Sequence, residues 1–319
     1  MEATYVSVVV PVFNEENNLE ILHRELSEAL KNLDKKYEII FVDDGSVDNS
    51  FQVLKKIKES DKSVKIIKLR RNFGQTSALS AGFDHSKGEI IISVDADLQN
   101  VPSDIPSLIS KLEEGYDIVN GWRWKRKDRF LTRKIPSAVA NWLISFITGI
   151  KLHDYGCTLK AYRKEVLKNV RLYGEMHRFI PAVASWMGIK VAEVKVNHRQ
   201  RKYGKSKYGI SRTIRVILDL ITVKFLISYS TRPLQIFGLF GFISFFVGFI
   251  LGLYLSYEKI ILREAIGGRP LLLLAVLLMF LGAQFITLGL LAEMLSRTYH
   301  EAVEKKIYVI KEILDEDEK

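Results

Sequence analysis

Two long stretches without a charged residue constrain the fold of this chain more than any other feature. They run from Leu234 to Tyr257 and from Leu271 to Ala292, and each exceeds the roughly 20 residues that cross a hydrocarbon core of about 30 Å. The glycines among bulky apolar residues in the first stretch are more typical of a membrane helix than of a buried core helix. Because the connection, residues 258–270, is short and polar, the pattern predicts a membrane hairpin with both flanks on one side.

The flanks of this hairpin indicate a compartment. Lys and Arg dominate the segment before the first stretch, which favours the cytosol by the positive-inside tendency, although Lys259, Arg263 and Arg269 in the connection make the asymmetry incomplete. The N-terminal MEATYVSVVVPVF lacks a basic region followed by an apolar one, so no secretory signal is expected. The single cysteine, Cys157, excludes an internal disulfide, fits a reducing compartment and is expected to pack in a core. We therefore expect a multi-pass protein of the cell (plasma) membrane with a cytosolic main domain.

The first half of the chain alternates between two kinds of pattern. Short runs rich in β-branched residues predict strands at 5–12, 38–42, 64–69 and 89–94. Helical spacing of apolar residues predicts helices at 17–33, 51–58 and 75–84. Strands separated by helices predict an α/β domain with a doubly wound, mainly parallel sheet.

Polar residues follow three of the predicted strands, where ligands gather in sheets of this kind. The first strand is followed by Asn14 and Glu15, and the second by Asp43 and Asp44. The fourth runs directly into the segment DADLQ, whose Asp95 and Asp97 are spaced to face one divalent cation. Mg²⁺ is usually held by one or two carboxylates together with phosphate oxygens, which suits a nucleoside diphosphate ligand. The chain has neither a P-loop nor a G-x-G-x-x-G after the first strand, which disfavours kinases, ATPases and dinucleotide enzymes.

Four ordered motifs, VVVPVFNEENNLE, VDDGSVDNS, RRNFGQTSALSAGF and DADLQ, carry a resemblance to a known family. The chain resembles the family 2 glycosyltransferases with the GT-A fold. It is most similar to the membrane-anchored polyprenyl-phosphate glycosyltransferases, which include dolichyl-phosphate mannose or glucose synthases and undecaprenyl-phosphate sugar transferases. The resemblance extends over essentially the whole chain, because the basic segments, the hairpin and the tail SRTYHEAVEKKIYVIKE also match.

The resemblance implies roles for individual residues. It assigns the nucleotide sugar to Pro11, Phe13, Glu15, Val42, Asp44, Asp95, Ala96, Asp97, Gln99, Arg123, Arg201 and Lys207. It assigns Mg²⁺ or Mn²⁺ to Asp95, Asp97 and Gln99, and the acceptor lipid phosphate to Arg123, Arg133 and Ser137. It places Asp154 near the sugar, as a catalytic residue together with Asp95 and Asp97. The chain departs from the pattern at Tyr155, where the subfamily often has threonine, and at Cys157, where other members have aspartate.

The net charge of +10 is concentrated in two basic segments, residues 123–134 and 196–212. Basic and aromatic residues together bind single-stranded nucleic acid, an anionic membrane or a phosphorylated acceptor. The membrane hairpin favours the two lipid interpretations. The amphipathic pattern that follows predicts a helix at the membrane surface or one packed on the main domain. We expect a catalytic domain at 1–210 and an interfacial helix at 211–231. Two membrane helices are expected within 232–295, and a cytosolic tail at 296–319.

Three histidines and one arginine that could contact a ligand lie outside these motifs. His177 and Arg178 either touch the sugar or support the fold. His153 and His198 lack the spacing of metal ligands, so no zinc site is expected.

The resemblance implies an inverting transfer of one hexose from a nucleotide diphosphate sugar to a polyprenyl phosphate. UDP-glucose is the first choice of donor and GDP-mannose the second, with undecaprenyl or dolichyl phosphate as acceptor and a homo-oligomer, a tetramer by resemblance, as the assembly. A processive polysaccharide synthase is disfavoured, because the chain lacks a Q-x-x-R-W motif. A noncatalytic nucleotide-binding scaffold and a nucleic-acid protein remain as weaker alternatives.

Overall fold

The computed structural model describes residues 4–124, 144–145, 149–170, 172, 174, 176–184, 187–200, 233–302, 308 and 310–315. The chain divides into two units. The first comprises Met1–Val223 together with Lys306–Lys319, and the second is Lys224–Lys305.

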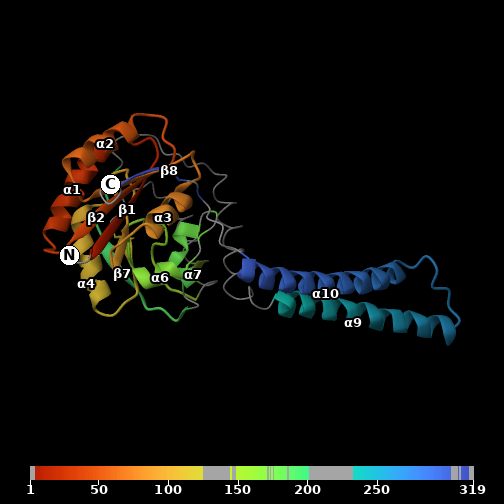
Figure 1. Cartoon of the computed structure of the whole chain (residues 1–319). Coiled ribbons are helices and arrows are strands. Elements are labelled where there is room, and N and C mark those ends of the chain that lie inside the picture. Colours follow the sequence, from red (N-terminus) through yellow and green to blue (C-terminus); the bar gives the residue numbers. More distant parts are fainter. Residues whose placement is uncertain are drawn as a thin grey trace. The chain divides into compact units, whose positions relative to one another are not determined.

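The first unit is built on a mixed sheet of eight strands in the order β7-β5-β6-β4-β1-β2-β3-β8 (Figure 1). The strands are β1 Val6–Val12, β2 Tyr37–Asp43, β3 Val64–Leu69, β4 Ile90–Ser93, β5 Ile118–Arg123, β6 Lys160–Arg163, β7 Val191–Val196 and β8 Ile310–Leu314. β1 pairs in parallel with β2 and β4, and β2 with β3, while β6 runs antiparallel to β4 and β5. The four strands expected from the sequence are confirmed to within two residues at either end.

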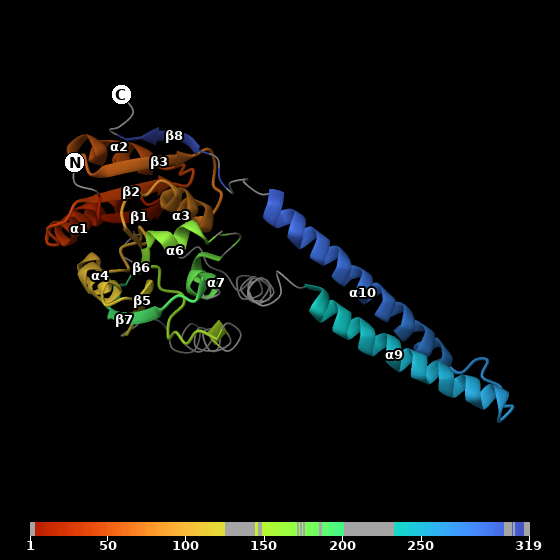
Figure 2. The same ribbon diagram turned by 60° about the horizontal axis from the view of Figure 1, so that its bottom comes forward.

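Helices cover both faces of this sheet. They are α1 Leu19–Lys31, α2 Ser50–Ser60, α3 Gln75–Asp84, η1 Pro102–Asp104, α4 Ile105–Glu113, α6 Lys164–Lys168, η3 Met176–Arg178 and α7 Ile180–Ala184. Alternate residues of β1, among them Val8 and Val10, pack in one core with the apolar sides of α1, α2 and α4. The opposite face meets α3, where a Cβ on Gly82 would lie 2.2 Å from Val9 Cγ1, so this helix approaches the sheet closely. Figure 2 shows α1 and α4 on one side of the strands and α3 on the other.

The second unit contains α9, Pro233–Ile260, and α10, Pro270–Ala302. Both include a span long and apolar enough to cross a membrane, Leu234–Ile260 and Pro270–Leu295, with mean hydropathy of 2.4 and 2.5. The two helices pack closely through glycine, because a Cβ on Gly241 would lie 2.7 Å from the carbonyl oxygen of Gly282. This is the close approach that small residues allow between membrane helices. The expected α/β domain followed by a pair of apolar helices is thus confirmed.

The segment after the hairpin forms the strand β8, which the sequence did not lead us to expect. β8 pairs antiparallel with β3, with Ile313 opposite Ile67. Asp315 lies 2.7 Å from the ammonium of Lys65, which is 7% exposed, and the Tyr308 hydroxyl donates a 2.7 Å hydrogen bond to Asp84. The end of the chain is therefore part of the sheet of the first unit.

Removing residues 306–319 is expected to destabilise the first unit. The truncation uncovers the backbone edge of β3 and takes the carboxylate of Asp315 away from buried Lys65, a loss of about 3 kcal/mol or more. Thermal unfolding of the full chain in detergent, followed by tryptophan fluorescence, measures the effect as a drop of several degrees in Tm. A matched truncation that removes only residues 316–319 keeps β8 and serves as the control. Equal Tm values for the two truncations would contradict a stabilising role of β8.

Candidate active site

The parallel pairing of β1 with β2 and β4 brings three strand ends to one edge of the sheet. Asp43 ends β2, and residues 13–15, 44 and 95–97 follow the three strands, so the carboxylates expected to act together do gather at this edge. Pro11 of β1 lies opposite Val42 of β2 in the register of the sheet. In doubly wound sheets this is the edge where ligands bind.

At the end of β2, the two aspartates have different surroundings. Asp44 accepts hydrogen bonds from the backbone N–H groups of Phe73 and Gly74, at 2.8 and 2.9 Å, and burial still raises its pKa above the ordinary value. Asp43 is fully buried and accepts the N–H of Ser46 through Oδ1 at 3.0 Å, while its Oδ2 has no hydrogen-bond partner among the described residues. A buried acceptor without a partner is costly, so this oxygen fits a donor group of a ligand.

At the end of β1, the backbone turns sharply. Asn14 has a φ of 54°, and its N–H donates to the Ser46 hydroxyl at 3.0 Å. The Glu15 carboxylate accepts a 2.5 Å hydrogen bond from the side-chain amide of Asn18, and the Glu15 N–H donates to the hydroxyl of Ser50 at 2.9 Å. Two of these bonds join the P-V-F-N-E segment to Ser46, in the turn after β2, and to Ser50, the first residue of α2.

The DADLQ segment follows β4 and places its two carboxylates close together. Asp97 is 7% exposed and its Oδ1 accepts the N–H of Gln99 at 3.1 Å. Asp95 Oδ1 accepts a 2.6 Å hydrogen bond from the side-chain amide of Gln75, the first residue of α3. Burial of its carboxyl group and then the charge of Asp97 raise the pKa of Asp95 to about 7. Ala96 between them is buried in the core.

This arrangement fits a divalent cation. Because burial and then the charge of Asp97 raise the pKa of Asp95, the ionised form of this pair is stabilised by a nearby positive charge. Among the described residues, no three His, Cys, Asp or Glu side chains form a cluster that holds a metal by itself. Mg²⁺ is usually held by one or two carboxylates that are completed by water and substrate phosphates.

A pocket opens beside Asp95. Its wall is formed by Leu79, Ser93, Val94, Asp95, Tyr155, Gly156, Cys157, Thr158, Lys160, Tyr162, His177 and Arg178. Asp95, Thr158 and Arg178 are partly exposed, whereas Lys160 and His177 are buried. The pocket therefore has cationic side chains in its wall next to the carboxylates of the DADLQ segment.

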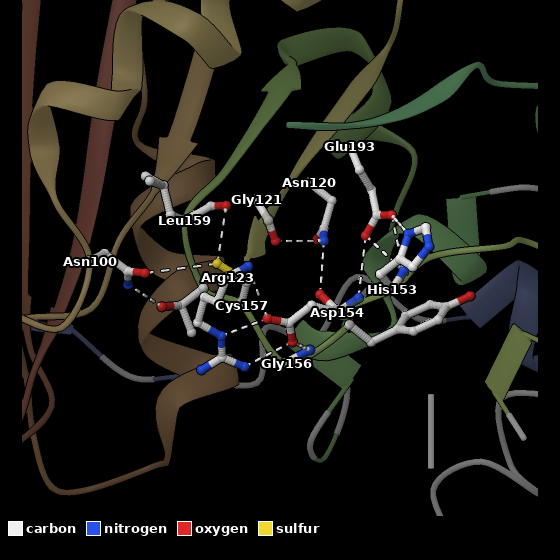
Figure 3. A network of polar contacts seen from close by, with 12 residues as sticks. Asn100, Asn120, Gly121, Arg123, His153, Asp154, Gly156, Cys157, Leu159 and Glu193 are labelled. Carbon is white, nitrogen blue, oxygen red and sulfur yellow. Dashed lines mark hydrogen bonds and ion pairs between the residues drawn. The ribbon is translucent and has the colours of Figure 1, made fainter. Parts of the chain in front are cut away.

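Arg123 and Asp154, both expected near the reacting groups, bind each other (Figure 3). The guanidinium donates through Nε and Nη2 to the two carboxylate oxygens, at 2.6 and 2.8 Å. The same carboxylate accepts the N–H of Gly156 at 3.2 Å, and Asn120 donates to the carbonyl oxygen of Asp154 at 2.8 Å. Asp154 is thus held in place by several donors, which is the environment of a positioning residue.

Cys157 packs in the core, as expected from the sequence. It is 1% exposed, and burial raises the pKa of its thiol to about 12. Four other expected site residues, Arg133, Ser137, Arg201 and Lys207, and the expected interfacial helix at 211–231 lie outside the described residues.

Two residues at this site were not singled out from the sequence. Gln75, which binds Asp95, lies in the quoted motif RRNFGQTSALSAGF, so the motif was a signal for it. Lys160 gave no such signal, because a lysine in a short strand normally faces solvent.

Comparison with known proteins adds to this geometry. Residues 7–171 match the family model described as glycosyl transferase family 2. A dodecaprenyl-phosphate galacturonate synthase of Rhizobium johnstonii is 44% identical over 99% of this chain and 95% of its own length. An undecaprenyl-phosphate 4-deoxy-4-formamido-L-arabinose transferase of Klebsiella pneumoniae is 40% identical over 98% of this chain and 94% of its own.

A solved structure is similar in fold. Glucosyl-3-phosphoglycerate synthase from Mycobacterium tuberculosis, in complex with Mn²⁺, UDP and glucosyl-3-phosphoglycerate, aligns with a TM-score of 0.55 at 18% identity. The alignment covers 70% of this chain and 80% of that one. At this identity the likeness concerns the fold alone.

Proposed function

We propose that this chain, which belongs to glycosyl transferase family 2, transfers one sugar from a nucleotide diphosphate sugar to the phosphate of a polyprenyl lipid. One observation supports the proposal most strongly. Asp43, Asp44, Asp95 and Asp97 lie at one edge of the sheet, beside a pocket that has cationic side chains in its wall. Relatives similar over nearly the whole chain are named for dodecaprenyl and undecaprenyl phosphate, which supports a lipid acceptor.

The donor lies across the strand ends in this proposal. The base and ribose contact Pro11, Phe13, Glu15, Val42 and Asp44. The Oδ2 of Asp43, which has no hydrogen-bond partner among the described residues, fits an N–H group of the base. The diphosphate lies at the DADLQ segment, where Asp95, Asp97 and Gln99 are the residues that hold Mg²⁺ or Mn²⁺. When bound, the cation offsets the negative charge that develops on the departing diphosphate.

The proposed reaction forms one bond and breaks one. An acceptor phosphate oxygen attacks the anomeric carbon from the face opposite the leaving group, so the configuration inverts, and the bond between that carbon and the β-phosphate oxygen breaks. The electron pair leaves with the nucleoside diphosphate. Because the attacking oxygen is already anionic, no strong general base is required. The protein mainly aligns two anions, with Arg123, Arg201 and Lys207 toward the donor phosphates and Arg123, Arg133 and Ser137 toward the acceptor.

The membrane arrangement follows from the hairpin. We place both flanks of the hairpin on one side of the bilayer, a placement supported by the sheet, which contains β3 from before the two apolar helices and β8 from after them. We place that side in the cytosol of a plasma-membrane protein, from the Lys and Arg residues before α9. The basic segments and an interfacial helix at 211–231 then face the anionic leaflet, and assembly as a homo-oligomer, a tetramer by resemblance, belongs to the same proposal.

The identity of the sugar is the finest part of the proposal. The motifs favour UDP-glucose, with GDP-mannose as the alternative. The two relatives carry the names of other sugars, a galacturonate and a formamido-arabinose, so galacturonate joins the candidate donors.

A donor and acceptor panel tests the proposed transfer. The purified full chain in vesicles receives each nucleotide sugar with undecaprenyl or dolichyl phosphate, and mass spectrometry identifies the lipid product. We expect one sugar added to one lipid phosphate, only when Mg²⁺ or Mn²⁺ is present. A polymeric product would point instead to a polysaccharide synthase, and the absence of any lipid-linked sugar would favour a nucleotide-binding scaffold.

A further inference from the structure

Gln75 joins the DADLQ segment to the loop before α3. Its side-chain amide donates a 2.6 Å hydrogen bond to Oδ1 of Asp95, although Gln75 begins α3 and Asp95 follows β4. Because an ionised carboxylate only accepts hydrogen bonds, the amide is assigned with its nitrogen toward Asp95. A hydrogen bond to a charged acceptor is roughly twice as strong as one between neutral groups. The amide of Gln75 is therefore suited to hold this carboxylate in one orientation.

The backbone that carries Gln75 is fixed on both sides. Gly74 precedes it with a φ of 94°, and the N–H groups of Phe73 and Gly74 donate to the carboxylate of Asp44 at 2.8 and 2.9 Å. On the other side, the N–H of Ser77 donates to the carbonyl oxygen of Gly74 at 3.0 Å, within the first turn of α3. The side chain that reaches the DADLQ segment thus extends from a backbone with a defined position.

The same loop packs closely on its neighbours. A Cβ on Gly45, in the turn after β2, would lie 2.5 Å from the carbonyl carbon of Arg71, closer than real side chains come. Thr76, which follows Gln75, is 3% exposed, and its hydroxyl is hydrogen-bonded to Nδ1 of His177 at 2.8 Å. These contacts keep the loop in place, so Gln75 differs from a freely rotating surface amide.

The function of Asp95 depends on its orientation. Rotation about its Cβ–Cγ bond decides which oxygen faces a cation, and the nearby negative charge of Asp97 repels both oxygens. A donor that holds Oδ1 limits this rotation. Removing a group that holds a metal ligand in this way typically costs about 10- to 100-fold in metal affinity or activity.

We propose that Gln75 is a positioning residue for the cation site, and that its amide holds Asp95 in the orientation that receives Mg²⁺ or Mn²⁺. The inference rests on the proposed function, because it takes Asp95 as a ligand of the cation and Asp44 as a contact of the nucleoside. Gln75 acts through Asp95 and touches no reacting group. The alternative is a contact that only ties α3 to the end of β4, which predicts lower stability without a specific effect on the cation.

Nucleotide binding with and without the cation separates these two roles. Calorimetry of the full chain in detergent gives the Kd of UDP, and of GDP in parallel, once in EDTA and once in Mn²⁺. The factor by which Mn²⁺ tightens binding is the quantity compared. Gln75→Met keeps the approximate length of the side chain and removes the amide. We expect it to lower this factor by about tenfold or more, and to leave the Kd in EDTA within about threefold of the wild-type value.

Asn169→Leu is the matched control, because it also removes a side-chain amide that donates a hydrogen bond. The Asn169 amide donates to the carbonyl oxygen of Glu165 at 2.9 Å. Glu165 belongs to α6, whose first residue, Lys164, donates its N–H to the carbonyl oxygen of Glu89, just before β4 begins. The control therefore lies at the opposite edge of the sheet from Asp95, and it should leave both Kd values unchanged. Thermal unfolding of both variants in detergent accompanies the binding data.

The outcomes separate this inference from the proposed function. An unchanged Mn²⁺ factor in Gln75→Met, or equal losses of affinity in Mn²⁺ and in EDTA, overturns the positioning role while transfer to lipid stands. Absence of a lipid product from every donor overturns the proposed function, whereas the Mn²⁺ factor still reports on Gln75.

Two further results also decide the question. If Gln75→Met does not fold, Gln75→Ala repeats the measurement, and failure of both to fold assigns Gln75 a structural role and overturns the inference. A wild-type chain that binds neither nucleotide, or binds them equally with and without Mn²⁺, overturns it as well.

Discussion

Replacing Asp97 by alanine is expected to lower kcat/KM for sugar transfer by about 1,000-fold or more while the protein stays folded. Asp97 is a nearly buried carboxylate whose charge contributes to the raised pKa of Asp95, so a divalent cation beside the two would be stabilised by both. Removing one carboxylate relieves like-charge repulsion, so stability should not suffer. The measurement is transfer to undecaprenyl phosphate in vesicles, with Mn²⁺-dependent UDP binding by calorimetry alongside.

Asp61→Asn is the matched control for this variant. Asp61 follows α2, and its carboxylate binds His23 and Ser63, away from the strand ends. Its replacement should leave kcat/KM within about threefold of the wild-type value. Near wild-type transfer by Asp97→Ala, or equal losses in both variants, would count against the metal assignment.

Replacing Asp154 by alanine should act first on stability. The Arg123 side chain is 14% exposed and would lose both hydrogen bonds to its bidentate partner. Breaking a buried ion pair by removing one of its members costs about 3–5 kcal/mol, whereas a carboxylate that served only as a proton acceptor could be removed at little cost. The measurement is the Tm of the full chain in detergent, which should fall by on the order of 10 °C.

A more exposed pair provides the comparison. Asp117 lies 3.9 Å from the Nε of Arg163, with both side chains about a third exposed, so Asp117→Ala should cost about 1 kcal/mol or less. The double variant Arg123→Met/Asp154→Leu removes both buried charges, and we expect it to regain most of the stability but not the transfer activity, because the guanidinium is proposed to face phosphate. A fully stable Asp154→Ala protein without activity would instead assign Asp154 to the chemical step.

The local patterns of the sequence were sufficient for the first half of the fold. Strands at 5–12 and 64–69 appear as β1 and β3, since short β-branched runs bounded by turns have few alternatives. The apolar helices were equally clear. The strand β8 was not, because its sequence IKEIL is short and carries two charges, and only the edge of β3, far earlier in the chain, gives it a partner.

Local sequence patterns likewise predict some residues of the candidate site and miss others. Asp95 and Asp97 were found because they follow an apolar strand directly. The pairing of Arg123 with Asp154 was missed, since it joins positions 31 residues apart through the arrangement of the sheet. Lys160 was missed because its burial depends on the carbonyl groups of two separate segments, which no local pattern reveals.

Counting the phosphates in the lipid product tests the central claim most directly. The full chain in vesicles is supplied with undecaprenyl phosphate labelled in its phosphate oxygens, a nucleotide sugar and Mn²⁺, and the product is analysed by mass spectrometry. A sugar joined to the lipid through one phosphate, which retains the label, is the expected result. A product with two phosphates, or no lipid-linked sugar from any donor, would contradict direct glycosyl transfer to a lipid phosphate.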